Sequence, residues 1–512
     1  MTGSSSLLNS SRQLSDAAPS SEEALCPPGL ADGDTTLTVG KNTSLTLGSD
    51  SLTIRDKQPI KKTARNCCGV LTSQQQTTLS IPYHNLLWAE ISHDYLTVKY
   101  AEPIGKTDVA VASAYYTVGH DLKLKAEIFV ERLLDLSYGD AQRRKRVKVL
   151  VNPFGGKGRA AKLYYKYVEP ILAAARCEID SETTTHQGHA EEIAAKLDIN
   201  AFDVIAACSG DGLPYEIING LGKKANASEA LAKIALAHIP CGSGNAMSWN
   251  INGTGSPSMA ALCLVKGVTH PLDLVSITQG DRRMLSFLSQ SFGIVAESDL
   301  GTENLRWMGS ARFTYGFLVR LFGKTVYPCD LAVKVEIGEK QQIKEHYRAE
   351  SQGSTSSEGR GGEGLGKSAG LPPLQYGTVN DPLPEDWELV PYDTMGNFYA
   401  GNMAFMAEDA NFFPAALPND GLLDLITIRG DIPRATAIQM LLAVDNGTLF
   451  DMPDVIYRKI SGYRIIPKGR EDGYISIDGE KAPFEPFQAE VHKGLGTVIS
   501  KSGFKYETKG MP

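Results

Sequence analysis

Three short apolar segments, each followed by a glycine-rich turn and then by a helical pattern, constrain the fold of this chain more than any other feature. The apolar segments are residues 147–151, 204–208 and 234–239. Strands that alternate with helices in this way are typical of an open α/β sheet, whose ligand crevice lies beyond the carboxyl ends of the strands. We therefore expect an α/β fold with a binding site where the three turns meet.

Asp211 lies between two glycines in the second turn. Apolar residues then recur every four positions, at Leu213, Ile217 and Leu221, which predicts a helix with one buried face. A turn from strand to helix can hold a carboxylate at the mouth of the sheet, and the glycines let a ligand approach the backbone. An isolated Gly-Asp-Gly would more simply be a surface turn, so its weight here depends on the other two turns.

The first turn argues against two common nucleotide-binding motifs. A Walker A loop ends in Gly-Lys-Ser or Gly-Lys-Thr, whereas residues 155–158 are Gly-Gly-Lys-Gly. The same residues do not fit the GxGxxG pattern of a Rossmann dinucleotide site. Glycine N–H groups at the start of a helix can still bind phosphate. The turn is therefore a candidate phosphate site outside both classes.

The three turns together resemble a known family. Their motifs are Asn-Pro-Phe-Gly-Gly-Lys-Gly, Ser-Gly-Asp-Gly-Leu and Pro-Cys-Gly-Ser-Gly-Asn-Ala. In order and spacing they resemble the diacylglycerol-kinase-type catalytic domain and, within that superfamily, the sphingoid long-chain-base (sphingosine) kinases. The long Ser-rich head, Cys67-Cys68 and a Gly/Ser-rich insertion suggest the fungal type. The resemblance implies a nucleotide-binding α/β domain followed by an antiparallel β-sandwich that binds lipid. It also implies an ATP- and Mg²⁺-dependent kinase that phosphorylates the primary hydroxyl of sphingosine, dihydrosphingosine or phytosphingosine.

The resemblance assigns roles to individual residues. Asp211 is expected to be the base that activates the lipid hydroxyl, with a magnesium-ligand role as the alternative. In the strand end at residues 184–188, His186-Gln187-Gly188 replaces the basic cluster of some relatives. The residues expected to bind the nucleotide are Asn152, Pro153, Phe154, Gly155, Gly156, Thr184, Thr185, His186, Gln187, Gly188, Ser209, Gly210, Gly212, Glu216, Gly242, Ser243, Gly244, Arg306, Arg312, Asp478, Gly479 and Glu480.

Asp299 is the residue expected to distinguish sphingoid bases from neutral lipids. A carboxylate can pair with the ammonium group of a sphingoid base, and diacylglycerol has no such charge; a plain helix N-cap is the alternative. Arg306 and Arg312 follow, and guanidinium groups suit phosphate oxygens. The residues expected to contact the lipid are Ser209, Gly210, Asp211, Gly212 and Asp299.

The late Asp478-Gly479-Glu480 sequence is typical of a hairpin turn. In the resembled family this segment returns to the catalytic cleft and brings the residue at the position of Glu480 near the nucleotide and the metal. The sequence does not identify the metal ligands themselves.

Composition bounds the partners. Lys and Arg total 51 against 59 Asp and Glu, and this net charge of −8 argues against nucleic-acid binding. Eight cysteines occur without a CxxC pair, so a zinc site is not expected and free buried thiols are. With no long apolar run and no secretory signal, we expect a cytoplasmic protein in peripheral contact with a membrane. The sequence leaves monomer and homodimer open.

Composition shifts along the chain suggest its organisation. The adjacent Cys67 and Cys68 follow basic residues in a Ser-rich head, and they are either ordinary thiols or an S-acylation site. The predicted regions are a disordered head at 1–76, a small β-rich module with a helix at 77–142, the α/β nucleotide-binding domain at 143–275, and an antiparallel β lipid-binding domain at 276–508 with a disordered insertion at 350–372.

Three rival functions remain open at this point. A diacylglycerol or ceramide kinase would use the same glycine turns, and an NAD-kinase relative would also carry a Gly-Asp-Gly turn. A lipid-binding scaffold on an inactive kinase fold would not need an intact Asp211. The apolar strands of the β-rich domain favour a lipid substrate, and therefore argue against the NAD-kinase relative.

Overall fold

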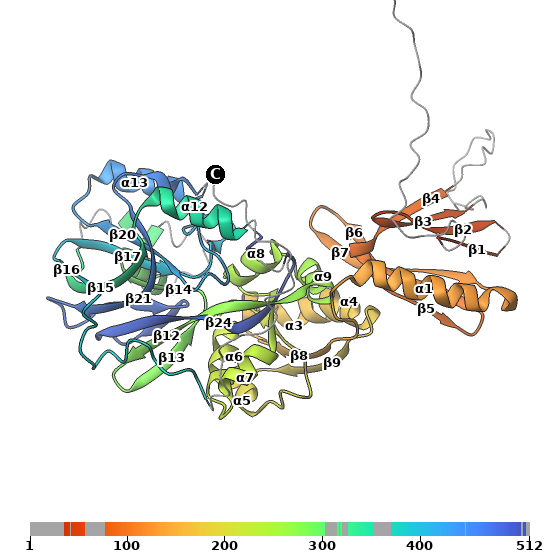
Figure 1. The fold of residues 1–512 in the computed structure, drawn as a ribbon, viewed down its shortest axis with the longest axis horizontal. Helices are drawn as coiled ribbons and strands as arrows, with labels where there is room; N and C mark the ends of the chain where they lie inside the picture. The colour runs from red at the N-terminus through yellow and green to blue at the C-terminus, as the bar shows by residue number, and fades with distance from the viewer. Residues whose placement is uncertain are drawn as a thin grey trace, which may run out of the picture.

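A computed structural model describes residues 35–40, 42–56, 77–302, 315–316, 318–319, 326–351, 370–445, 447–502 and 505–507. It consists of an N-terminal β module, a central α/β region and a C-terminal β-rich region (Figure 1). Several predictions lie outside the described residues: the pair Cys67 and Cys68, the arginines Arg306 and Arg312, and most of the predicted insertion at 350–372.

The N-terminal module contains two antiparallel sheets and one long helix, α1 (Lys123–Tyr138). The helix packs against β5 and β1, as the right side of Figure 1 shows. The strands of the first sheet are β1 (Thr36–Val39), β2 (Thr43–Leu47), β3 (Ser51–Asp56) and β4 (Thr77–Pro82), and those of the second are β5 (Leu86–Ser92), β6 (Tyr95–Ile104) and β7 (Asp108–Thr117).

The structure differs from the predicted disordered head at residues 36–56, which form β1, β2 and β3. Every second residue in these strands is apolar and buried, for example Leu37 and Val39, then Leu52 and Ile54. This period of two is that of a strand with one face in a core. The high Ser, Thr and Gly content hid that alternation, although threonine itself favours strands.

The module packs on the central region through polar contacts as well as apolar ones. The Asp108 carboxylate accepts hydrogen bonds from the hydroxyls of Ser256 (2.6 Å) and Ser258 (3.3 Å) at the start of α9 (Pro257–Lys266). Lys266 at the other end of α9 donates to the Ser137 carbonyl oxygen at 2.9 Å. Both ends of α9 are therefore tied to the module.

The central sheet is parallel, in the spatial order β9 (Glu178–Thr183), β8 (Arg146–Val151), β10 (Val204–Ser209), β11 (Ala235–Pro240). All residues of β10 and β11 are buried, as expected for strands covered by helices on both faces. The helices around them are α2 (Gly155–Gly158), α3 (Ala160–Leu163), α4 (Glu169–Ala174), α5 (His189–Lys196), α6 (Gly212–Gly222), α7 (Ala227–Lys233), α8 (Ala246–Asn252) and α9. The predicted α/β fold is confirmed.

The long strand β24 (Phe487–Ser500) joins the central sheet to the C-terminal region. It pairs in parallel with β11 and antiparallel with β12 (Val268–Gln279) and β21 (Ile456–Pro467). The other main elements are β13 (Arg282–Ser286), β14 (Ser289–Gly293), α10 (Ile294–Leu300), β15 (Cys329–Ile337), α12 (Lys340–Ser351), β16 (Glu388–Tyr392), β17 (Met395–Gly401), β18 (Phe405–Ala407), β19 (Ala410–Asn411), β20 (Leu423–Arg429), α13 (Arg434–Val444), β22 (Ile475–Ile477) and β23 (Glu480–Ala482).

These antiparallel strands surround one apolar core, which includes Phe292, Phe398, Tyr463 and Phe487. The predicted antiparallel β region is therefore confirmed, and it shares a continuous hydrogen-bonded network with the α/β region through β24. Among the helices of the described part of the chain, none has both the length and the apolar composition needed to cross a bilayer.

Candidate active site

The three glycine turns meet at the carboxyl ends of β8, β10 and β11. A Cβ added to Gly156, whose φ is +55°, would lie 2.2 Å from the Cys241 carbonyl oxygen. A Cβ on Gly242 would lie 2.2 Å from the Gly210 Cα, and one on Gly210 would lie 2.6 Å from the Gly244 oxygen. Each turn therefore packs backbone against backbone on another, which only glycine permits.

Asp211 lies at this junction, and its side chain is held by another helix. Its Oδ2 accepts a hydrogen bond from the Ala246 N–H (2.8 Å) and its Oδ1 accepts one from the Met247 N–H (3.0 Å), both in the first turn of α8. Its own N–H donates to the Gly244 oxygen at 3.2 Å. The side chain keeps 13% of its surface exposed. The carboxylate is therefore fixed in one orientation with one side still open.

His238, a residue that the sequence analysis missed, lies behind Asp211. Its ring is buried in β11, and its Nε2 is 3.1 Å from the Ser209 carbonyl oxygen. Its Nδ1 is 3.8 Å from Asp211 Oδ1 and has no hydrogen-bond partner. The available signal was a single polar side chain in an otherwise apolar strand, directly before a glycine turn.

The first turn is shaped by Asn152. Its Oδ1 accepts a hydrogen bond from the Phe154 N–H at 3.0 Å, and its backbone oxygen accepts one from Gly155 at 3.0 Å. Pro153 lies between them and is partly exposed, while the Phe154 ring is 78% exposed. Asn152 thus builds the turn, and Phe154 presents an aromatic ring beside it.

The third turn is held by Asn245, which the sequence analysis did not single out. Its Oδ1 accepts from the Gly242 N–H at 3.0 Å and its Nδ2 donates to the Gly242 oxygen at 3.1 Å. Ser243 and Gly244 are left exposed at the tip. In the second turn, the buried Ser209 hydroxyl donates to the Gly210 oxygen at 2.5 Å.

Glu216 connects two parts of the predicted nucleotide site. It lies in α6, and its carboxylate accepts hydrogen bonds from the N–H groups of Gly188 (3.0 Å) and Ala190 (3.1 Å) at the start of α5. The carboxylate therefore lies at the positive end of the α5 dipole. Its role in this structure is to hold the segment before α5 against α6.

That segment, residues 184–188, lies beside the first turn. Thr184 is buried and continues the strand, because its N–H donates to the Val151 oxygen at 2.9 Å. Thr185, His186 and Gln187 are exposed. The His186 Nε2 lies 3.1 Å from the Glu192 carboxylate. The exposed tip is thus available to a ligand, while Thr184 has a structural place.

The Asp478-Gly479 pair forms the predicted hairpin turn between β22 and β23, with φ values of +51° and +83°. The Asp478 carboxylate is buried and accepts hydrogen bonds from the Ser286 hydroxyl (2.6 Å) and from the N–H groups of residues 287–289 (each 2.9 Å). Burial raises its pKa to about 6, although these hydrogen bonds oppose the shift. Asp478 therefore anchors the turn and does not face an open cavity.

The anchored turn brings Glu480 to the predicted site. A Cβ added to Gly212 would lie 3.4 Å from the Glu480 carboxylate oxygen. Gly212 begins α6 directly after Asp211. A segment far along the chain thus places a second carboxylate beside Gly212, the residue that follows Asp211.

Asp299 lies in the last turn of α10, whose N-cap is Gly293, so it does not cap this helix. It lies near Tyr399 of β17. Burial raises the pKa of the Tyr399 phenol, a hydrogen bond with Ser289 opposes that shift, and the charges of Asp299 and Asp478 add to it. The structure therefore brings Asp299 to the same region as the anchored turn.

Two family models match the chain: a domain of unknown function (DUF7493) at residues 35–139 and the diacylglycerol kinase catalytic domain at residues 146–277. Sphingoid long chain base kinase 4 of Schizosaccharomyces pombe is 32% identical over 446 residues, which cover 86% of this chain and 92% of that protein. The chain belongs to the sphingoid long-chain-base kinase family. The resemblance drawn from the three motifs is thereby confirmed.

Other members of the sphingoid long-chain-base kinase family are also similar. Sphingoid long chain base kinase 5 of Saccharomyces cerevisiae is 36% identical over 431 residues, and the match covers 74% of this chain but 62% of the yeast protein. A crystal structure of a diacylglycerol kinase from Bacillus anthracis has a TM-score of 0.45 and 18% identity over 70% of this chain and 97% of that one. The first family model begins at residue 35, before β1, which agrees with the strands at residues 36–56.

In the described part of the chain the cysteines are free thiols, as predicted: Cys177, Cys208, Cys241, Cys263 and Cys329. Within the described residues, no group of three or more His, Cys, Asp and Glu side chains could hold a metal ion. In this part of the chain the protein alone therefore offers no cluster of ligands for the predicted Mg²⁺.

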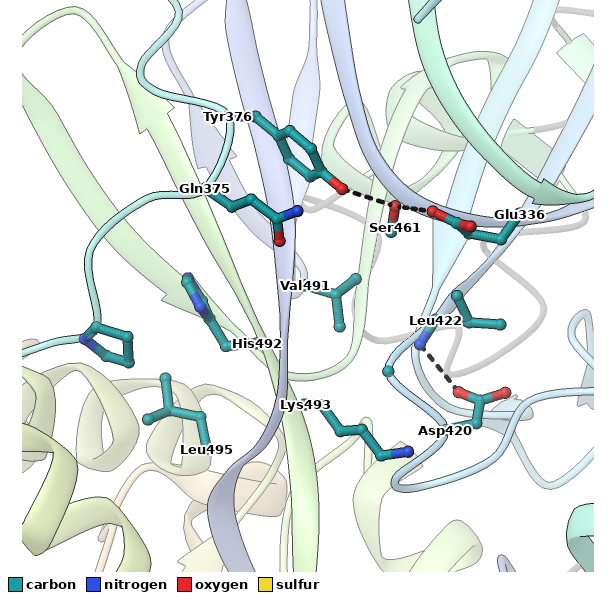
Figure 2. A pocket seen from close by; sticks show the side chains of 12 residues that line it. Glu336, Gln375, Tyr376, Asp420, Leu422, Ser461, Val491, His492, Lys493 and Leu495 are labelled. Atoms are coloured by element: carbon teal, nitrogen blue, oxygen red, sulfur yellow. Dashed lines mark hydrogen bonds between the residues drawn. The ribbon is translucent and has the colours of Figure 1, made fainter. Parts of the chain in front are cut away.

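A pocket of about 520 Å³ lies in the C-terminal region, between β15, β21 and β24, and none of the predicted site residues lines it. Figure 2 shows the Ser461 hydroxyl between the Tyr376 hydroxyl (3.3 Å) and the Glu336 carboxylate (2.6 Å). Asp420 also lines it, but this carboxylate is already paired with Lys459 at 2.8 Å. The pocket is separate from the glycine turns.

Proposed function

We propose that this protein is an ATP- and Mg²⁺-dependent kinase that phosphorylates the primary hydroxyl of sphingoid bases. The observation that carries the proposal is the position of Asp211. Its carboxylate is fixed by two N–H groups of α8 at the point where three glycine turns meet. Phosphoryl transfer to an alcohol needs a base for the hydroxyl and a site that holds the phosphates in line with it.

In this proposal the glycine turns bind the phosphates of ATP. Gly156, Gly210 and Gly242 leave no room for a Cβ. The first turn opens into helical residues, so its N–H groups that are not bonded to Asn152 would meet the anion. Exposed Phe154 and the tip of residues 185–187 would lie along the nucleotide. Arg306 and Arg312 are proposed to bind the triphosphate on the strength of the family resemblance, since both lie outside the described residues.

The residues near Asp211 fit a magnesium ion that is held mainly by the nucleotide. Mg²⁺ in such sites is bound by phosphate oxygens and water with one or two carboxylates. Glu480, next to Gly212, would supply a carboxylate. When bound, the ion would neutralise charge on the transferring phosphate.

Asp211 then receives the proton of the lipid hydroxyl as the hydroxyl oxygen attacks the γ-phosphorus of ATP. The bond from the γ-phosphorus to the bridging oxygen breaks, and ADP leaves with that electron pair. Because Asp211 is already oriented by α8, no rotation of the carboxylate is needed before the transfer.

Asp299 is proposed to pair with the ammonium group of the sphingoid base. Asp299 lies near Tyr399, and the negative charge of its carboxylate contributes to the raised pKa of the buried Tyr399 phenol. A charge-assisted hydrogen bond to an ammonium group contributes roughly 1.5–3 kcal/mol. Ceramide and diacylglycerol lack this cation, so the contact would select sphingoid bases.

Peripheral membrane contact is also part of the proposal. The lipid substrate resides in membranes, and Cys67 with Cys68 would be acylated beside Lys61, Lys62 and Arg65. Two acyl chains anchor a protein where one gives only marginal binding. The mass of the protein in solution would distinguish a monomer from a homodimer.

The proposal is tested by a transfer assay with labelled ATP against sphingosine, dihydrosphingosine, phytosphingosine, ceramide and diacylglycerol. We expect label in the three sphingoid bases and little in the two neutral lipids. Preferred labelling of ceramide or diacylglycerol would replace the sphingoid-base assignment with a neutral-lipid kinase. Lipid binding without label in any of the five would favour the scaffold.

A further inference from the structure

His238 is a buried polar group beside the proposed base, and nothing in the reaction described so far uses it. It lies in β11, two residues before the third glycine turn begins at Pro240-Cys241. Its side chain has no exposed surface. A buried imidazole with an unsatisfied nitrogen lowers the stability of the folded protein. Its position beside Asp211 therefore suggests a functional role.

The hydrogen bond of Nε2 defines the form of the ring. The Ser209 carbonyl oxygen, 3.1 Å away, can only accept, so Nε2 carries the proton. In the neutral ring Nδ1 is then an unprotonated acceptor. Burial lowers the pKa of His238, and this effect outweighs the charge of Asp211, which acts in the opposite sense. At neutral pH the ring is uncharged.

Nδ1 faces Asp211 Oδ1 at 3.8 Å. Both atoms are acceptors, so the resting site holds two lone pairs opposite each other with no proton between them. The two carboxylate oxygens already accept from Ala246 and Met247, and neither of those N–H groups can accept a proton in return. Nδ1 is therefore the acceptor toward which a proton on Oδ1 would point.

We propose that His238 is a positioning residue whose Nδ1 accepts a hydrogen bond from Asp211 once that carboxylate has taken the proton of the lipid hydroxyl. This inference rests on the proposed function. The hydroxyl O–H bond breaks, the O–P bond to the γ-phosphorus forms, and the bond to the leaving ADP oxygen breaks. The proton stays on Asp211, hydrogen-bonded to Nδ1, and passes to water when the products leave.

The hydrogen bond from Asp211 to Nδ1 would stabilise the transition state but not the bound substrates. Two N–H donors hold the carboxylate in one orientation. An acceptor that gains a partner only after proton transfer favours the protonated form, and interactions that form only then increase kcat without changing substrate binding. His238 should therefore affect kcat and leave KM for ATP and lipid unchanged.

Two substitutions separate the two ring nitrogens. His238→Gln places an amide N–H near the position of Nε2, so it keeps the bond to Ser209 and removes the acceptor at Nδ1. His238→Asn places its amide oxygen near Nδ1 and removes the donor to Ser209. The first variant tests the proposal, and the second is its matched control.

We expect His238→Gln to lower kcat for sphingosine by about ten- to a hundred-fold, as expected for the loss of one strong hydrogen bond in the transition state, with KM for both substrates unchanged. His238→Asn should retain most of kcat while its Tm falls. In an Asp211→Asn background, His238→Gln should cause no further loss, because it acts through Asp211.

A wild-type kcat in His238→Gln would overturn the proposal. It would also be overturned if both variants lost kcat equally and in proportion to the decrease in their Tm. If His238→Asn does not fold, the comparison of His238→Gln with and without Asp211 still decides. The reference is transfer by the wild-type protein. Its absence on every lipid contradicts the proposed function, whereas normal transfer by both the wild type and His238→Gln contradicts only the role of His238.

Discussion

Gly242→Ala tests the close packing of the glycine turns that underlies the site. An added Cβ would lie 2.2 Å from the Gly210 Cα and 2.3 Å from the Gly210 nitrogen, where ordinary contact begins at 3.4 Å. The obstructing atoms are backbone, so no side chain can rotate away. The two turns must therefore separate by about 1.2 Å, and a displacement of about 1 Å at a reacting centre can cost a hundredfold in rate.

The assay is kcat for sphingosine at saturating ATP, with Tm and ATP affinity measured on the same preparation. We expect kcat to fall by about a hundredfold and ATP to bind more weakly, because the second and third turns both move. Gly338→Ala is the matched control: its φ is not positive, and its nearest neighbour would be the Val335 Cγ1 at 3.8 Å. Wild-type kcat in Gly242→Ala would refute the reasoning, as would an equal loss in Gly338→Ala.

Two further predictions concern the lipid and the membrane. Asp299→Asn should lower kcat/KM for sphingosine by about ten- to a hundred-fold, since a charge-assisted hydrogen bond contributes roughly 1.5–3 kcal/mol, and should leave KM for ATP unchanged in steady-state kinetics. A parallel loss of ATP affinity would show that it acts through the fold. Cys67→Ser with Cys68→Ser should move the protein from membrane to soluble fractions with unchanged activity on detergent-dispersed substrate, and an unchanged membrane fraction would leave both as ordinary thiols.

The features that could be predicted from the sequence are those carried by local patterns. The strands before the three glycine turns, the helix after Asp211 and the hairpin at Asp478-Gly479 all have signals within a few residues, and the structure contains each of them. The family assignment followed from the same motifs. Residues 36–56 show that a local pattern can be overlooked, because their alternation was present but lay in a Ser- and Thr-rich stretch.

The features that could not be predicted depend on partners that are distant in the chain. Asp211 is held by α8, some 35 residues away, and Asp478 by residues 286–289, about 190 residues away. Glu216 reaches across to Gly188. In each case the residue type was noticed, but its partner is set by the packing of the sheet and not by the local sequence.

These distant contacts give two of the predicted nucleotide-binding residues a structural role. The carboxylates of Glu216 and Asp478 accept hydrogen bonds from N–H groups of the protein, so both side chains shape the site, and their contact with the nucleotide stays a prediction. Glu480 and the exposed parts of the glycine turns remain as candidates for that contact.

The central claim is that Asp211 is the base for phosphoryl transfer, and Asp211→Asn tests it most directly. Asparagine keeps the size of the side chain and one acceptor for the N–H groups of Ala246 and Met247, but it cannot take the proton. The measurement is single-turnover transfer of labelled phosphate from ATP to sphingosine, with ATP affinity and Tm as controls. We expect transfer to fall by at least about a hundredfold with ATP still bound. Transfer within a few-fold of the wild type would contradict the account.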